Sequence, residues 1–225
     1  MKERPADWAF PLPRFGDRRR IRVGVLGGSF NPAHAGHRHV ASQMLRRLRL
    51  HQVWLLVSPG NPLKPVEGMD TLAHRLAAAR RLVDGRRMIA SAIEAAWGTR
   101  YTHATLMRLR RHFPRIKFVW LMGADNLIGL PRWQRWMDIA RMLPFAVYPR
   151  PSYNYRALAG QAARRLRKWR RRFAEAGALA EASPPAWIFV PSSQHSASAT
   201  ALRAAAQSPK KGESDHRTYT THHAA

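Results

Sequence analysis

The 225-residue chain has no cysteine, few acidic side chains and no long apolar run. The absence of cysteine excludes disulfide bonds and metal sites built on thiolates. No apolar stretch approaches the length needed to span a membrane, and the N-terminus lacks the apolar core of a signal peptide. We therefore expect a cytoplasmic protein with no membrane partner.

The scarcity of acidic residues leaves a large positive charge. Only 13 Asp and Glu oppose 39 Lys and Arg, which gives a formal net charge of +26. Such a charge attracts ATP, nucleotides, RNA or an acidic membrane surface alike, so charge alone does not choose among them. We expect no specific nucleic-acid partner, because no RNA-binding motif accompanies the charge. A nonenzymatic nucleic-acid-binding protein remains the rival function.

Strand and helix patterns alternate along the chain. Apolar runs predict buried strands at residues 21–26, 53–57, 118–122, 145–148 and 187–190, with a weaker candidate at 88–90. Apolar residues at helical spacing predict helices at residues 37–49, 72–83, 102–112 and 156–176. This order predicts an α/β fold, a Rossmann-like doubly wound parallel sheet with helices on both faces and ligands at the carboxyl ends of the strands.

The ends of the chain differ from its middle. We expect a flexible basic arm at residues 1–20, one domain at 21–206 and a mobile polar tail at 207–225. The helix expected at 156–176 carries seven basic residues between positions 164 and 172. A solvated helix face explains them, and a surface for a polyanion or a membrane is the alternative.

The most informative stretch is the run GGSFNPAHAGH at residues 27–37, directly after the first expected strand. Glycines allow a tight turn and close approach of a phosphate to main-chain amides, and a helix N-terminus adds N–H donors and a positive dipole end. His34 and His37 stand three residues apart, on one side of the first helical turn. Each could donate a hydrogen bond to a phosphoryl oxygen.

Other interpretations of this run are weaker. The spacing is neither the Rossmann G-x-G-x-x-G nor a Walker loop followed by Gly-Lys-Ser/Thr. The two histidines lack the cysteines or nearby carboxylates that would complete a zinc site, so we expect no protein-bound metal. Histidines that merely cap a glycine turn are the remaining alternative.

The run resembles the first motif of the nucleotidyltransferases that carry H-x-G-H, and most closely the bacterial nicotinate-nucleotide adenylyltransferases. Three further stretches match that family in order, and the resemblance spans residues 21–203. They are GNPLKP at 60–65, GADNL at 123–127 followed by Trp133, and SATALR at 198–203. The expected function is transfer of AMP from ATP to nicotinate mononucleotide, with Mg²⁺ carried on the ATP.

The resemblance also implies which residues form the site. The implied catalytic residues are His34, His37, Lys64 and Arg203. The implied ATP-binding residues are Gly27, Gly28, Ser29, Phe30, His34, His37, Ser198, Thr200 and Arg203. The implied nicotinate-nucleotide-binding residues are Asn31, Lys64, Thr102, Asp125, Trp133 and Arg150.

Several of these residues have ordinary structural explanations. Trp133 could pack in the core or stack on a pyridine ring, and Asp125 could cap a helix or orient the nucleotide. A loop lysine such as Lys64 is usually just solvated. His103 and Ala104 depart from the small-then-polar pair common in the family, which leaves the shape of the carboxylate pocket open. Nicotinamide mononucleotide or another small phosphate, such as phosphopantetheine, therefore stays an alternative substrate.

Overall fold

The structure is a computed structural model, and it describes residues 20–60, 68–150 and 152–191. Most of the expected terminal arm and tail lies outside these residues. So do four predicted site residues, Lys64, Ser198, Thr200 and Arg203.

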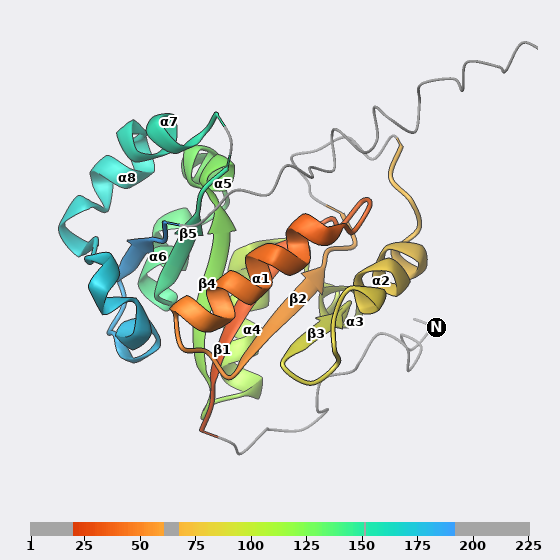
Figure 1. The fold of residues 1–225 in the computed structure, drawn as a ribbon. Helices are drawn as coiled ribbons and strands as arrows, with labels where there is room; N and C mark the ends of the chain where they lie inside the picture. The colour runs from red at the N-terminus through yellow and green to blue at the C-terminus, as the bar shows by residue number, and fades with distance from the viewer. Residues whose placement is uncertain (1–19, 61–67, 151, 192–225) are drawn as a thin grey trace, which may run out of the picture.

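The centre of the fold is a parallel six-stranded sheet with strand order β3-β2-β1-β4-β5-β6 (Figure 1). The strands are β1 (Arg22–Gly28), β2 (Gln52–Val57), β3 (Met88–Ser91), β4 (Lys117–Gly123), β5 (Phe145–Tyr148) and β6 (Trp187–Phe189). All six strand predictions are confirmed, including the weak one. The order reverses between β1 and β4, and in a doubly wound sheet the crevice at this point binds ligands.

Helices cover both faces of the sheet, as the alternation predicts. Helices α1 (Ala35–Arg47) and α2 (Leu72–Arg81) pack with the 3-10 segment η4 (Phe173–Glu181) over one apolar cluster. The opposite cluster contains residues of α3 (Ile93–Trp97), α4 (Thr102–His112), α5 (Ala124–Gly129) and α6 (Trp136–Met142), together with η2 (Leu130–Arg132), α7 (Asn154–Ala159) and α8 (Gln161–Arg165). Alternate residues of each strand therefore point into the apolar clusters on the two faces of the sheet.

The prediction of one continuous helix at residues 156–176 is wrong. The chain forms α7, α8, η3 (Arg167–Trp169) and η4 instead. Gly160 is extended, with φ −73° and ψ 166°, and separates α7 from α8. Farther along, the Arg171 N–H donates to the Trp187 carbonyl at 2.8 Å, which draws the backbone beside β6. This pairing takes precedence over a helical pattern that is otherwise regular.

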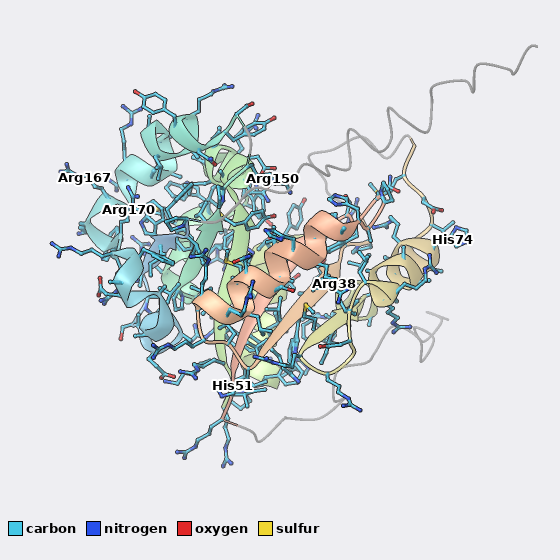
Figure 2. The ribbon with its side chains drawn as sticks, viewed as in Figure 1. Arg38, His51, His74, Arg150, Arg167 and Arg170 are labelled. Carbon is cyan, nitrogen blue, oxygen red and sulfur yellow. The ribbon has the colours of Figure 1, made fainter. Side chains whose placement is uncertain are left out.

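The basic side chains of this segment nevertheless face solvent. All seven between positions 164 and 172 are exposed, and Figure 2 shows Arg167 and Arg170 on the edge of the molecule that carries α7 and α8. Their apolar neighbours Ala162 and Leu166 are buried. The expected division into an apolar stripe and a charged surface thus survives the loss of the single helix.

In the described part of the chain, no helix combines the length and apolar character required to cross a membrane.

Candidate active site

The site begins where β1 gives way to α1. Phe30 takes a left-handed backbone conformation, with φ of 49°, and its buried ring lies under Gly28. A Cβ atom on Gly28 would come 3.2 Å from that ring, whereas one on Gly27 would meet no protein atom within 4 Å. Gly28 thus permits the turn, and Gly27 leaves room for a ligand above the main chain.

The two histidines of the run cap helix α1. His34 is the N-cap residue, and its Nδ1 atom accepts from the Gly36 N–H at 3.1 Å. The Nδ1 atom of His37 accepts from the His34 N–H at 3.2 Å. Because a neutral imidazole with an accepting Nδ1 carries its proton on Nε2, the His37 ring keeps an Nε2–H donor that its contact with His34 does not use. The ring centroids are 3.9 Å apart, so the two imidazoles lie side by side at the start of α1.

His37 is held in the neutral form. Its pKa falls from 6.5 to about 3, chiefly through burial and in addition through the charges of His34 and Arg150. Arg150, which follows β5, thus contributes a positive charge to the surroundings of His37. A neutral donor beside a fixed cation suits a phosphate.

A cavity of about 310 Å³ opens beside the glycine turn. Five predicted site residues line it: Gly27, Gly28, Ser29, Thr102 and Trp133. Thr102 is the first residue of α4, so the free N–H groups of that helix N-terminus lie at the cavity wall. The cavity therefore joins the phosphate turn to an aromatic side chain and a second helix terminus.

Trp133 packs against a neighbouring ring and also lines the cavity. Its ring packs against Trp120 with centroids 5.5 Å apart, and the residue is only partly buried. Because Trp133 also lines the cavity, one side of the ring is held by packing while the residue contributes to the cavity wall. An aromatic ring fixed in this way is suited to stacking on a planar ligand.

Asp125 and Arg150 form an ion pair between the chain after β4 and the chain after β5. The Arg150 Nε and Asp125 Oδ1 atoms are 3.3 Å apart and buried, without the alignment of a hydrogen bond. Asp125 does not cap α5, whose N-cap is Gly123. A Cβ on Gly123 would lie 2.3 Å from Asp125 Oδ1, so the pair needs glycine there. The pair does not line the cavity, and Figure 2 shows Arg150 at the carboxyl end of the sheet.

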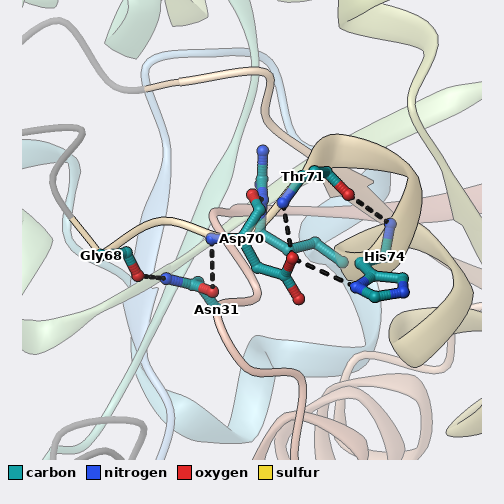
Figure 3. Close-up of polar contacts among 6 residues, drawn as sticks. Asn31, Gly68, Asp70, Thr71 and His74 are labelled. Carbon is teal, nitrogen blue, oxygen red and sulfur yellow. Dashed lines mark hydrogen bonds and ion pairs between the residues drawn. The ribbon is translucent and has the colours of Figure 1, made fainter.

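Asn31 contacts protein rather than the cavity. Its amide donates to the Gly68 carbonyl at 3.0 Å and accepts from the Asp70 N–H at 3.3 Å (Figure 3). Asp70 accepts from the Thr71 N–H at 2.7 Å and contacts His74. Asn31 therefore fastens the glycine turn to the segment that enters α2.

Arg75 is a site residue that sequence reasoning missed. Only 2% of the residue is exposed. Its Nη1 atom donates to the carbonyls of Ser29 and Ser58 at 2.6 and 2.7 Å, and its Nε atom donates to the Asp70 carbonyl at 2.9 Å. Burial lowers its pKa. One guanidinium thus connects the loops that follow β1 and β2.

Other residues around the cavity were also not anticipated. Glu94, Arg100, Asn126, Arg132 and Gln134 line it. Among the described residues, no group of three or more His, Asp or Glu side chains could hold a metal ion. The N–H groups of the glycine turn and the arginines of the cavity lining suit phosphate oxygens.

A glycine turn that leads into a helix N-terminus at the reversal point of a parallel sheet is the arrangement of an α/β nucleotidyltransferase, and sequence comparison agrees. The family described as cytidylyltransferase-like matches residues 25–205. A protein of Gluconacetobacter diazotrophicus, named a probable nicotinate-nucleotide adenylyltransferase, is 53% identical over 94% of this chain and 98% of its own. A Bradyrhizobium protein with the same name is 48% identical over 81% and 95%.

The fold has solved counterparts. The nicotinic acid mononucleotide adenylyltransferase of Plasmodium falciparum, complexed with NaAD, superposes with a TM-score of 0.62 at 14% identity, over 82% of this chain and 83% of the other. That likeness shows the nucleotidyltransferase fold. The sequence identity of about half to the bacterial relatives shows more than the fold. The chain belongs to the nicotinate-nucleotide adenylyltransferase family.

Proposed function

We propose that this chain transfers AMP from ATP to nicotinate mononucleotide, giving deamido-NAD and pyrophosphate. The observation that carries the proposal is the histidine pair at the start of α1, in which His37 is held neutral, beside a cavity that contains Trp133 and the first turn of α4. The relatives' printed names support the choice of nicotinate mononucleotide. A cytoplasmic location remains a prediction.

The reaction needs no protein nucleophile. An oxygen of the mononucleotide phosphate attacks the α-phosphorus of ATP, and the bond from that phosphorus to the bridging oxygen breaks as pyrophosphate leaves. The attacking phosphate is already anionic at neutral pH. Catalysis then depends on holding two anions together and on offsetting charge at the reacting phosphorus.

In this proposal one group of residues binds the phosphates of ATP, and a second group binds the mononucleotide. His34 and His37 donate to ATP phosphates above the open space at Gly27, with His37 directed to the α-phosphate. Arg150, oriented by Asp125, adds a fixed positive charge. Family resemblance gives Lys64, Ser198, Thr200 and Arg203 phosphate contacts, and Mg²⁺ enters with ATP as part of that substrate because it keeps much of its water shell.

The mononucleotide occupies the cavity. Its pyridine ring stacks on Trp133, and its carboxylate meets the hydroxyl of Thr102 and the free amides of the α4 N-terminus. Asn31 has an indirect role toward this substrate. Its hydrogen bonds to Gly68 and Asp70 position the glycine turn relative to the segment that enters α2.

Pyrophosphate release measured with ATP and a panel of acceptors tests the proposal. The panel contains nicotinate mononucleotide, nicotinamide mononucleotide and phosphopantetheine. We expect the highest kcat/KM for nicotinate mononucleotide. A higher value for either of the other acceptors would replace the substrate. No release with any of them, together with tight nucleic-acid binding at physiological salt, would support the nonenzymatic alternative.

A further inference from the structure

The cavity contains one carboxyl group that the proposed mechanism does not use. Glu94 belongs to α3, just beyond the carboxyl end of β3. Among the described residues that line the cavity, it is the single Asp or Glu. A carboxyl group is an unexpected component of a cavity proposed to hold a carboxylate, since two like charges repel at close range.

Glu94 connects directly to the helix that begins at the cavity wall. The Thr105 hydroxyl donates to Glu94 Oε1 at 2.8 Å, and the Thr105 N–H donates to the Tyr101 carbonyl at 3.2 Å. Thr105 therefore links the carboxyl to the first turn of α4, where Thr102 stands. Ser58, which follows β2, also lies near enough to lower the pKa of Glu94. These contacts fix the carboxyl group in the cavity wall.

The surroundings determine the charge of this group. Burial raises the pKa of Glu94 to about 7, and the hydrogen bond from Thr105 and the nearby Ser58 oppose that rise. Strand β2, which packs against α3, has no titratable side chain. Titratable groups that contact α3 or line the cavity elsewhere are Arg100, Tyr101, Arg108, His112 and Arg132.

We propose that Glu94 is a specificity-determining residue of the cavity, where its carboxyl group discriminates between an anionic and a neutral substituent on the pyridine ring. This inference rests on the proposed function. A protonated Glu94 accommodates the nicotinate carboxylate, whereas an ionised Glu94 repels it. The carboxamide of nicotinamide mononucleotide carries no charge and tolerates both forms.

The preference between the two mononucleotides should therefore change with pH. A pKa of about 7 leaves roughly nine-tenths of Glu94 protonated at pH 6 and one-tenth at pH 8. If only the protonated form accepts the carboxylate, the ratio of kcat/KM for nicotinate over nicotinamide mononucleotide falls by about tenfold between these values. Titration of the substrate phosphate changes both kcat/KM values equally and cancels from their ratio, because both mononucleotides carry the same phosphate.

The Glu94→Gln variant provides the decisive test. Gln keeps an acceptor for Thr105 but cannot ionise, so the ratio should stay constant from pH 6 to pH 8. Glu181→Gln is the matched control, since Glu181 lies outside the cavity in an exposed pair with Lys117, and it should keep the wild-type pH dependence. A ratio that is flat in the wild type, or equally steep in Glu94→Gln, would overturn the inference.

Thr105→Val gives a second test that does not depend on the stability of Glu94→Gln. It removes the donor that favours the ionised carboxyl, so the pKa of Glu94 should rise and the midpoint of the ratio should move to higher pH. An unmoved midpoint would count against Glu94. Failure of this inference is distinct from failure of the proposed function. The former leaves a preference for nicotinate mononucleotide that does not depend on Glu94, and the latter appears as no turnover of either mononucleotide or as a higher kcat/KM for another acceptor.

Discussion

The His34 N–H lies 3.2 Å from the Nδ1 atom of His37, so the first histidine of the run determines where the second carries its proton. The two side chains therefore have different structural roles. His34 caps α1 and orients His37, whose Nε2–H remains available. This relationship makes the run from Gly27 to His37 one preorganised unit.

Replacement of His37 by alanine should lower kcat strongly while leaving the fold intact. Loss of a preorganised donor to the reacting phosphate costs on the order of 10²-fold or more in kcat. The fold is expected to persist because His37 is only partly buried and His34 still caps the helix. His51→Ala is the control, since His51 is exposed beside Arg22, at the opposite end of β1 from the glycine turn. An unchanged kcat in folded His37→Ala would contradict the assigned role.

His37 should remain neutral far into the acid range. Its pKa is about 3 in the folded chain against 6.5 without burial. Between these values the unfolded chain binds a proton that the native chain does not, so the free energy of unfolding should fall as pH falls below 6.5. Nitrogen-15 NMR at pH 6 should report a neutral ring with its proton on Nε2. A His37 imidazolium at that pH would contradict the prediction.

Trp133→Ala should affect one substrate much more than the other. Base-on-aromatic stacking contributes roughly 1–3 kcal/mol, which corresponds to an increase of about 5- to 160-fold in the KM for the mononucleotide. The KM for ATP should change little, since ATP is assigned to the histidine side of the site. Trp169→Ala, in η3 outside the cavity, is the control for loss of a partly buried tryptophan. Equal increases in both KM values would identify Trp133 as a packing residue.

Much of this site could be predicted because its signals are local. The run at residues 27–37 contains both the strand end and the helix cap, and the structure places them as the spacing indicates. Thr102 lies at the helix start that the pattern predicts. The prediction of one continuous basic helix was wrong because it also relied on a local pattern. The hydrogen bond from Arg171 to Trp187, which competes with the helix, joins residues far apart in the sequence.

Arg75 and Glu94 show what local patterns do not reveal. Arg75 lies on the buried stripe of α2 with Leu76 and Ala79, and that position was the one available signal in a chain crowded with arginine. Its carbonyl partners come from two other loops, which only the assembled sheet brings together. Glu94 follows β3 directly, but its place in the cavity depends on α4 packing against its helix.

The exposed basic segment should be dispensable for adenylyl transfer. Neutralising Arg165, Arg167, Lys168 and Arg171 removes solvated charges, and the pairing of Arg171 with Glu175 is an exposed contact of small value. Turnover at saturating ATP and mononucleotide should be nearly unchanged. Adsorption to RNA or DNA should weaken, and each lost phosphate contact should reduce the logarithmic salt slope by about 0.7 to 0.9.

A second variant with the same change in charge shows whether that adsorption is local. It neutralises Arg86, Arg87, Arg110 and Arg111, which are also exposed. Equal losses of adsorption in both variants would indicate that the net charge of the whole chain attracts polyanions. A much larger loss in the 165–171 variant would locate a binding surface on this segment. A large fall in turnover of that variant alone would contradict the prediction, because it would tie the basic segment to catalysis.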